Sequence, residues 1–416
     1  MSKFIVNTSN QLNGIASVSG SKNSALPIIS ASLLCRGVSK IKNVPCLSDI
    51  DNMCAILLKL GCKVTRSNGT IEIDSANATP VSLPYELTGK IRASFIVAGS
   101  LVSRFKSATI ALPGGCTIGT RPVDLHLKGF TALGCQHHIK DGFVHIEASK
   151  LCGGKVYLDF PSVGATQNVI LASVYASGTT VIENCASEPE IEDLVNFLNK
   201  CGADIRGAGT DKITINGVSE LVGCEYSIIP DRIEAGTLMV AAAATGGNIT
   251  LKNIIPSHLT SVTSKLSEIG INCVEFADEI TVSSEKTKNS TTVKTMPFPG
   301  FPTDMQSQIA AMLSCIEGTS VITETIFENR FMYVPELIRM NADIKVDGRS
   351  AVIKGTSSLV GAEVNATDLR AAAALVIAGL CANGKTIINN ADYLNRGYEC
   401  LDLKLKALGA DVWIED

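Results

Sequence analysis

Apolar and polar positions follow a pattern that recurs about every 70 residues along the chain. In each copy an amphipathic helix ends at one residue suited to the left-handed conformation, and two short β-rich segments follow. These helix stops are Gly61, Gly134, Gly202, Gly270, Asn341 and Gly409. Because glycine and asparagine adopt this conformation most easily, the one exchange for asparagine supports the alignment of the copies.

The helices before these stops carry apolar residues on one face only. In residues 48–60, Ile50, Met53 and Leu57 form one stripe, and Ser48 with Asp51 forms a capping-box pattern. Residues 191–201 repeat the stripe. These segments are expected to bury one face and expose the other.

Each copy also contains a second helix that is apolar or small on nearly every face, which predicts burial on all sides. The six segments are residues 24–34, 92–102, 164–176, 233–244, 305–316 and 370–382. The sequence therefore predicts an α/β protein of six repeats, three per domain, around buried helices. The expected domains are residues 22–229, and residues 1–21 together with 230–416.

The composition and net charge of the chain exclude several classes of function. The chain has 416 residues, 45% of them hydrophobic, and a formal net charge of −4, so it lacks a general basic surface for nucleic acid or anionic lipid. Its 14 cysteines form no C-x-x-C pair, which is typical of reduced cytoplasmic thiols and disfavours zinc. No signal peptide is expected, and the longest apolar run, residues 371–382, is too short for a membrane span.

Cations gather at helix starts, where the helix dipole disfavours them. They are Lys22, Arg92, Arg232 and Arg370 on the buried helices, and Arg121, Arg330 and Arg396 on the amphipathic ones. Any single one is explained as a solvated residue, but the set predicts an anion-binding cleft between the domains. Asp304 occupies an equivalent helix start. It either complements the dipole or acts as a general base.

The segment PGGCTIGTRPVDLH, residues 113–126, combines features of a reactive lid. Its paired glycines allow a hinge, and Cys116 can serve as an acid or a nucleophile. Arg121 can hold an anion. Cysteine is more often a small buried hydrophobe, and that alternative stays open on the loop alone.

Together these motifs resemble one family. GSKNSALP, PGGCTIGTRPVDLH, FPSVGATQN, PDRIEAGT, FPTDMQ, ENRFM, ATDLRA and NRGYE are similar to UDP-N-acetylglucosamine 1-carboxyvinyltransferases, from about residue 14 to the C-terminus. The related shikimate-pathway enolpyruvyl transferases share the repeat but lack the cysteine loop. The resemblance implies an inside-out α/β barrel of two domains, built from six βαβαββ units.

The resemblance also implies an activity. The enolpyruvyl group of phosphoenolpyruvate passes to the 3-hydroxyl of UDP-N-acetylglucosamine, and phosphate is released without a metal or organic cofactor. This is the first committed step of peptidoglycan biosynthesis, which links the chain to cell shape and cell division. A cytoplasmic enzyme inhibited by fosfomycin is implied, with the monomer favoured among oligomeric states.

The resemblance assigns roles to individual residues. Lys22, Asn23, Arg121 and Arg396 would contact phosphoenolpyruvate. Cys116 would be the general acid and the site of a covalent adduct, and Asp304 would accept the hydroxyl proton. Arg330 and Arg370 would support the cleft. The sugar nucleotide would contact Arg92, Arg121, Pro122, Val123, Asp124, Leu125, Ser162, Val163, Gly164 and Ile326.

One position departs from the family pattern. Phe160 stands where some members carry a lysine, so a charge contact to the diphosphate there is in doubt, although the amides of Ser162 and Val163 could serve. Two other functions stay open. The acceptor could be shikimate 3-phosphate, or the repeat could be a catalytically silent scaffold that binds UDP-sugars.

Overall fold

The computed structural model describes residues 2–9, 11–88, 92–112, 123–284, 288–356 and 358–415. Cys116, Arg121 and Pro122 of the predicted site lie outside the described residues, and so does the side chain of Arg92. Contacts divide the described chain into two compact units. We call residues 20–112 with 123–229 the continuous unit, and residues 2–19 with 230–415 the split unit.

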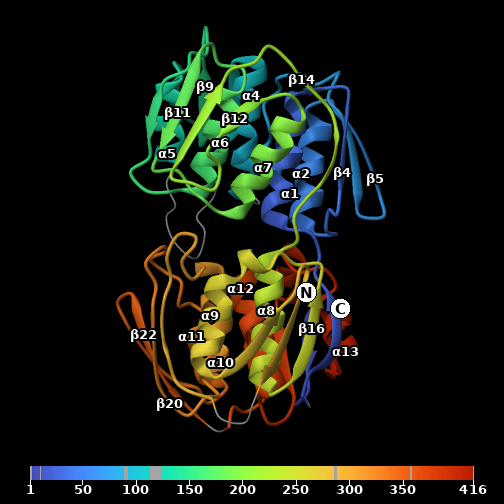
Figure 1. The fold of residues 1–416 in the computed structure, drawn as a ribbon, viewed down its shortest axis with the longest axis vertical. Coiled ribbons are helices and arrows are strands. Elements are labelled where there is room, and N and C mark those ends of the chain that lie inside the picture. Colours follow the sequence, from blue (N-terminus) through green and yellow to red (C-terminus); the bar gives the residue numbers. More distant parts are fainter. Residues whose placement is uncertain are drawn as a thin grey trace. The chain divides into compact units, whose positions relative to one another are not determined.

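Each unit contains helices that are buried on nearly every face (Figure 1). Those of the continuous unit are α1 (Lys22–Ala31), α4 (Val97–Phe105) and α6 (Val163–Ser173). Those of the split unit are α8 (Arg232–Thr245), α10 (Gln306–Leu313) and α12 (Leu369–Cys381), which pack on one another. The short 3₁₀ turns η2 (Arg92–Ile96) and η4 (Thr303–Met305) lead into α4 and α10. The predicted buried helices are confirmed.

The amphipathic helices follow the predicted spacing: α2 (Ser48–Lys59), α5 (Asp124–Ala132), α7 (Pro189–Lys200), α9 (Thr260–Ile269), α11 (Val334–Arg339) and α13 (Leu401–Ala407). All six predicted stops have positive φ, from 71° at Asn341 to 112° at Gly202. The capping box at Ser48 was wrong. The carbonyl of Leu47 accepts the amides of Ile50 and Asp51, so Leu47 is the N-cap and Ser48 lies in the first turn.

The strands form small sheets beside these helices. In the continuous unit their orders are β15 (Glu225–Ser227), β4 (Val38–Lys42), β6 (Thr70–Asp74), β5 (Lys63–Ser67); β7 (Ser107–Ala111), β9 (Phe143–Glu147), β8 (Gln136–Lys140); and β10 (Lys155–Tyr157), β11 (Thr179–Glu183), β13 (Lys212–Asn216), β12 (Asp204–Arg206). A two-stranded pair joins β3 (Cys35–Arg36) to β14 (Leu221–Val222). Shorter helical turns are η1 (Ser32–Leu34) and α3 (Tyr85–Thr88).

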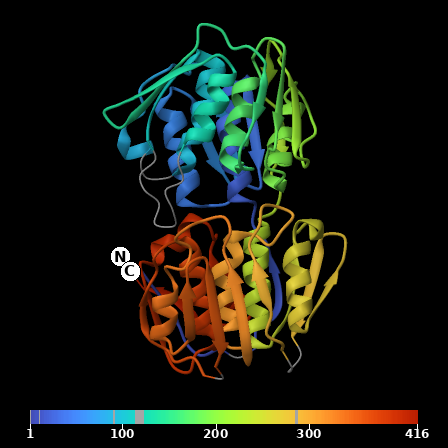
Figure 2. The same cartoon turned by 90° about the vertical axis from the view of Figure 1, so that its left-hand side faces the viewer.

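In the split unit the orders are β17 (Ile271–Glu275), β18 (Glu279–Ser284), β16 (Asn248–Lys252), β2 (Asn13–Ser17); β19 (Thr292–Lys294), β20 (Gly318–Thr323), β22 (Ser350–Gly355), β21 (Asp343–Asp347); and β23 (Glu363–Asn365), β24 (Thr386–Asn389), β1 (Lys3–Val6), β25 (Val412–Glu415). The turns η3 (Pro256–His258) and η5 (Ala391–Arg396) complete the unit. Figure 2 shows these strands, yellow to red except for the blue N-terminal ones, beside the helices of their own unit.

The N-terminal segment belongs to the split unit through its hydrogen bonds. Strand β1 lies between β24 and β25 and is antiparallel to both, and β2 runs parallel to β16. In the continuous unit β15 likewise runs parallel to β4. In each unit, one edge strand comes just before the chain passes into the other unit. This passage lies between residues 19 and 20 after β2, and between residues 229 and 230 after β15.

A buried carboxyl holds the chain just before the second crossing. Asp193 of α7 accepts hydrogen bonds from the Tyr226 hydroxyl at 2.6 Å and from the Ile229 amide at 3.2 Å. Burial raises the pKa of Asp193 to about 6, although both hydrogen bonds act in the opposite direction. The protonated form is therefore favoured by folding.

Close helix packing depends on glycine at one position of α4. A Cβ on Gly99 would lie 2.5 Å from the carbonyl oxygen of Asn168 and 2.9 Å from Cβ of Leu171. A Cβ on Gly236 of α8 would meet only the flexible end of Met305, at 3.0 Å. The same substitution therefore has different consequences at the two sites.

We expect Gly99→Ala to lower the free energy of unfolding by about 1–3 kcal/mol, because α4 and α6 must separate. The matched Gly236→Ala change should stay within about 1 kcal/mol of wild type, since helix propensity offsets the crowding. Urea unfolding of both variants measures this. Equal stability of the two variants would contradict the packing argument.

We expect Asp193→Asn to flatten the pH dependence of stability. The pKa of Asp193 rises from 3.8 to about 6 on folding. This carboxyl therefore makes its whole contribution to the free energy of unfolding below pH 4 and loses that contribution as pH rises through 6. Between pH 5 and 7.5 the variant should lose about 1–1.5 kcal/mol less unfolding free energy than wild type. Urea unfolding at both pH values tests this, with the exposed Asp278→Asn change as a control. If the unfolding free energy of Asp193→Asn depended on pH as steeply as that of wild type, the prediction would be refuted.

Candidate active site

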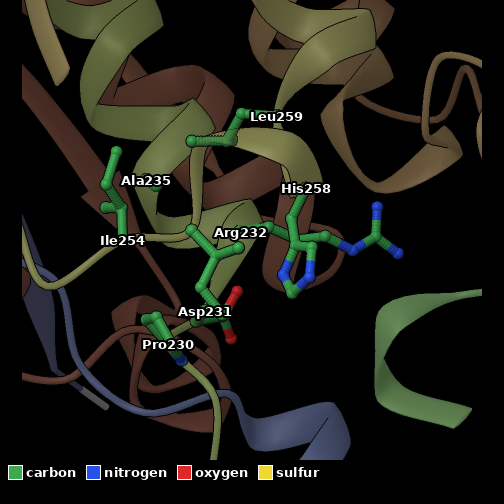
Figure 3. Close-up of a pocket in the computed structure, with 8 residues that line it drawn as sticks. Pro230, Asp231, Arg232, Ala235, Ile254, His258 and Leu259 are labelled. Atoms are coloured by element: carbon green, nitrogen blue, oxygen red, sulfur yellow. The ribbon is translucent and has the colours of Figure 1, made fainter. Parts of the chain in front are cut away.

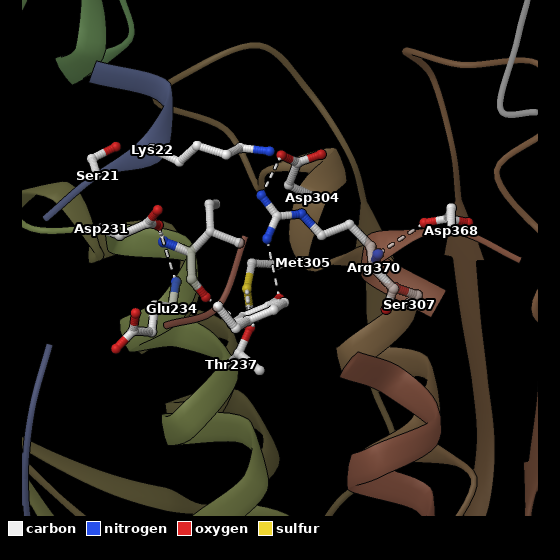
Figure 4. A network of polar contacts seen from close by, with 12 residues as sticks. Ser21, Lys22, Asp231, Glu234, Thr237, Asp304, Met305, Ser307, Asp368 and Arg370 are labelled. Carbon is white, nitrogen blue, oxygen red and sulfur yellow. Dashed lines mark hydrogen bonds and ion pairs between the residues drawn. The ribbon is translucent and has the colours of Figure 1, made fainter. Parts of the chain in front are cut away.

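Asp304 of the split unit is held by two buried arginines, of which Figure 4 shows Arg370. Its Oδ1 accepts from Nη2 of Arg330 at 2.8 Å, and its Oδ2 accepts from Nη2 of Arg370 at 2.9 Å. The arginine side chains are 4% and 5% exposed, whereas that of Asp304 is 29% exposed. The carboxylate is thus fixed from within the unit and keeps an accessible side.

Two groups of this cluster lie at the starts of buried helices, whereas Arg330 lies in the loop between β20 and α11. Asp304 lies in η4, directly before buried α10, and Arg370 lies in the first turn of buried α12. The cap of α12 is Asp368, whose carboxylate accepts the amides of Arg370 and Ala371. Burial alone would lower the pKa of Arg370, but the Asp304 carboxylate and Tyr398 reverse this and raise it. Arg370 therefore stays charged.

Glu324 organises the loop that carries Ile326 and Arg330. This buried side chain accepts the amides of Ile326 at 2.8 Å and Phe327 at 3.1 Å, and the hydroxyl of Thr303 at 2.9 Å. The guanidinium of Arg330 lies over the Phe327 ring. Glu324 thereby ties this loop to the residue before Asp304. Sequence reasoning missed it, because a glutamate after a strand gives no signal of its own.

Arg396, the remaining predicted residue of the split unit, ends η5 and is half-buried. It lies two residues before Tyr398, whose hydroxyl accepts from Nη1 of Arg370 at 3.1 Å. The structure thus brings together Asp304, Arg330 and Arg370 in direct contact. Arg396 and Ile326 belong to segments adjoining them.

In the continuous unit Lys22 is paired. It is the first residue of α1, and its Nζ lies 3.2 Å from Oδ2 of Asp49 with both side chains buried. Asp49 lies in the first turn of α2, and the start of α2 lies against the start of α1, so Asp49 supplies the counter-charge that the buried lysine needs. Asn23 follows at a half-buried position.

The predicted sugar-nucleotide residues that the structure describes in this unit lie at the starts of α5 and α6. Ser162 caps α6 by accepting the amide of Ala165, and Val163 and Gly164 form its first turn. Gly164 lies against His126 of α5, since a Cβ there would be 3.2 Å from Cε1 of that ring. The remaining residues precede or begin α5: buried Val123, exposed Asp124 and half-buried Leu125.

His126 is a structural centre of this region. Its Nδ1 lies 2.8 Å from Nδ2 of Asn168, and its ring meets Phe95 edge to face at 5.2 Å. Asn168 also accepts the amide of Gly99 at 2.7 Å and donates to the Phe95 carbonyl. Phe160 is 42% exposed, so the chain presents an aromatic surface at this position.

A small depression lies at the start of α8 in the split unit (Figure 3). It has no room for even a water-sized group and is lined by Pro230, Asp231, Arg232, Ala235, Ile254, Ile255, His258 and Leu259. A ligand of nucleotide-sugar size needs several hundred Å³, so we assign this depression no substrate. Every helix that the structure describes is too short or too polar to span a bilayer.

Known proteins share this fold. The chain superposes over 100% of its length on 99% of the enolpyruvyl transferase NikO from Streptomyces tendae, with a TM-score of 0.89 and 26% identity. EPSP synthase from Acinetobacter baumannii matches with a TM-score of 0.77 and 19% identity, over the whole of both chains. The architecture is that of the two-domain enolpyruvyl transferases, and the predicted fold class is confirmed.

Sequence comparison identifies the family. The profile of EPSP synthase (3-phosphoshikimate 1-carboxyvinyltransferase) matches residues 6–405, and the chain belongs to this family. UDP-N-acetylglucosamine 1-carboxyvinyltransferase 1 of Caldanaerobacter subterraneus is 53% identical over 411 residues, 99% of each chain. UDP-N-acetylglucosamine 1-carboxyvinyltransferase 2 of Carboxydothermus hydrogenoformans is 50% identical over 414 residues, also 99% of each. The resemblance noted in the sequence is confirmed.

We expect Asp304→Asn to lower the free energy of unfolding by about 2–3 kcal/mol, because two buried guanidiniums then lose their negative partner. Thermal and urea unfolding measure the change. The control is Asp343→Asn, which removes an exposed carboxylate of the same unit and should stay within about 0.5 kcal/mol of wild type. A similarly stable Asp304→Asn protein would show that Asp304 does not neutralise the arginines.

Proposed function

We propose that this enzyme transfers the enolpyruvyl group of phosphoenolpyruvate to the 3-hydroxyl of UDP-N-acetylglucosamine and releases phosphate. The observation that carries the choice of acceptor is full-length identity of 53% to a relative named for that reaction. The proposal places the chain at the first committed step of peptidoglycan biosynthesis. We also propose that the protein is a cytoplasmic monomer that needs no cofactor. Through peptidoglycan synthesis it would support cell shape and cell division.

The reaction defines the chemical groups required. A bond forms between the sugar oxygen and C2 of phosphoenolpyruvate, while C3 gains a proton and the hydroxyl loses one. Elimination then breaks the bond from C2 to the phosphate oxygen, returns a proton from C3 and restores the double bond. An acid, a base and fixed positive charge for two anionic substrates are therefore needed.

Asp304 is the proposed base. An ionised carboxylate is the form that accepts a proton, and two guanidiniums favour that form. Each oxygen already accepts one hydrogen bond from an arginine, so the sugar hydroxyl approaches from the exposed side. Because Arg330 and Arg370 are already held in place, they stabilise charge without reorganising during the reaction.

The proposed acid is Cys116, in the loop outside the described residues. Its thiol would protonate C3 and could form the covalent adduct, while Arg121 of the same loop would contact phosphoenolpyruvate with Lys22, Asn23 and Arg396. Lys22 is held by Asp49, which fixes the position of its ammonium group. Arg92, Pro122, Val123, Asp124, Leu125, Ser162, Val163, Gly164 and Ile326 would hold the sugar nucleotide.

A second acceptor is tested in the same assay. The family profile carries the name of an enzyme that acts on 3-phosphoshikimate, which makes shikimate 3-phosphate the natural competitor. We expect phosphate release from phosphoenolpyruvate only with UDP-N-acetylglucosamine. Release with shikimate 3-phosphate alone would replace the proposed acceptor, and binding of the sugar nucleotide without any release would leave a silent scaffold.

We expect Asp304→Asn to reduce kcat by at least about 100-fold, because an amide cannot accept the hydroxyl proton. Steady-state phosphate release measures kcat and both KM values. Glu328→Gln, an exposed carboxylate in the nearby loop, is the control and should keep wild-type kinetics. Wild-type turnover in Asp304→Asn would remove the base from the mechanism.

We expect Cys116→Ala to abolish turnover or to shift its pH profile strongly, and Cys116→Asp to retain activity, since a carboxylic acid can also donate the proton. The Asp variant should lose alkylation by fosfomycin, because the nucleophilic sulfur is gone. Phosphate release and mass spectrometry of the labelled protein test this. Unchanged kinetics in Cys116→Ala, or continued labelling of this loop in Cys116→Asp, would reject the assigned role.

A further inference from the structure

A buried polar network lies directly behind Arg370. The Tyr398 hydroxyl is within hydrogen-bond distance of Nη1 of Arg370 at 3.1 Å, Nε2 of Gln308 at 3.1 Å and Oγ1 of Thr237 at 3.0 Å. These side chains are 2–4% exposed or fully buried. The three buried helices of the split unit each contribute one member, and Tyr398 follows η5.

The direction of the tyrosine proton in this network follows from its neighbours. Guanidinium and amide nitrogens only donate, so the Tyr398 oxygen accepts from Arg370, and Nε2 of Gln308 directs one proton toward the Tyr398 oxygen and Oγ1 of Thr237, which lies 3.2 Å away. The single tyrosine proton must then point to Oγ1 of Thr237. The threonine proton in turn goes to the carbonyl of Ile233 at 2.7 Å, a better acceptor than the Met305 sulfur at 3.8 Å.

The orientation of the Gln308 amide is fixed as well. Its nitrogen lies 2.8 Å from the main-chain carbonyl of Asp304, which needs a donor. Its oxygen lies 2.9 Å from Oγ of Ser307, which is equally close to the Arg370 carbonyl. The reversed amide would set two acceptor oxygens against each other. Gln308 thus links the backbone of Asp304 to the tyrosine that holds Arg370.

Arg370 connects this network to the Asp304 carboxylate. One Nη is anchored on Tyr398 and the other contacts Oδ2 of Asp304, so the planar guanidinium has little freedom to rotate (Figure 4). We propose that Tyr398, Gln308 and Thr237 are positioning residues that hold Arg370 in the orientation which fixes Asp304 for proton transfer. The proposal rests on the proposed function, in which Asp304 is the base.

The direct test is Tyr398→Phe, which keeps the ring and removes the acceptor for Nη1 of Arg370. We expect kcat to fall about 10- to 100-fold while KM for both substrates changes by less than about threefold. The acidic limb of the kcat–pH profile should move to higher pH, because a misplaced guanidinium favours the ionised carboxylate less. Phosphate release from pH 5 to 9, with thermal melting, supplies these readouts.

A pair of variants at Thr237 keeps the test decisive if the Tyr398→Phe protein fails to fold. Thr237→Val preserves shape but gives the tyrosine proton no acceptor, so it should reproduce the loss of kcat and the pH shift. Thr237→Ser restores the hydroxyl and should return kcat to within about twofold of wild type. A Ser variant as impaired as the Val variant would overturn the proton order.

Tyr175→Phe is the matched control for losing a buried tyrosine hydroxyl. Tyr175 donates to the Leu34 carbonyl at 2.6 Å and accepts the Leu221 amide at 3.1 Å, both in the continuous unit. Its removal should lower stability and leave kcat and the pH profile unchanged. If Tyr398→Phe behaves in the same way, the network has only a structural role and the proposal is wrong.

The outcomes separate this proposal from the proposed function. An inactive Asp304→Asn enzyme together with a Tyr398→Phe enzyme of wild-type activity rejects positioning and leaves the base in place. Wild-type turnover in Asp304→Asn rejects the base and, with it, the purpose assigned to the network. Reduced kcat and a shifted pH profile in Tyr398→Phe, beside an inactive Asp304→Asn, support both.

Discussion

A helix buried on every face can present polar chemistry only at its ends, and this constraint organises the whole molecule. The buried helices consist mostly of small and apolar residues, and their charged side chains lie in the terminal turns, as Lys22 does at the start of α1 and Arg104 at the end of α4. Lys22 at α1, Asp304 before α10 and Arg370 at α12 all occupy such positions. The repeat places similar helix starts in each unit, and function can then be concentrated there by a few substitutions.

The same constraint explains how much the sequence predicts. Three kinds of element can be recognised from the sequence alone. A helix buried on all sides and a helix buried on one side differ in their hydrophobic periodicity, and a positive-φ helix stop favours glycine or asparagine. Asn341 illustrates this, because only the spacing identifies it as the equivalent of five glycines, and its φ of 71° agrees. The capping box at Ser48 failed because a local pattern cannot tell which carbonyl begins a helix.

The sequence did not predict which side chains of different elements pair with one another. Lys22 and Asp49 belong to different helices, and Tyr398 is an aromatic residue in a motif in which only Arg396 was assigned a role. Their partners are set by which helix starts lie together, and a single sequence carries no signal for that. Burial supplies the physical reason for these pairs. A lysine or guanidinium that is nearly inaccessible to solvent must find its counter-charge within the unit, because an unpaired buried charge costs several kcal/mol.

Buried carboxyls also hold the backbone where the chain passes between units. Glu234 accepts the Ser19 amide at 3.3 Å and is paired with Lys404, just as Asp193 accepts the Ile229 amide. Burial raises the pKa of Glu234 to about 7, and Lys404 opposes this. An apolar side chain could fill either space but could not satisfy the amide. Each carboxyl therefore fixes a backbone amide beside the point where the chain passes between units, at a cost in desolvation.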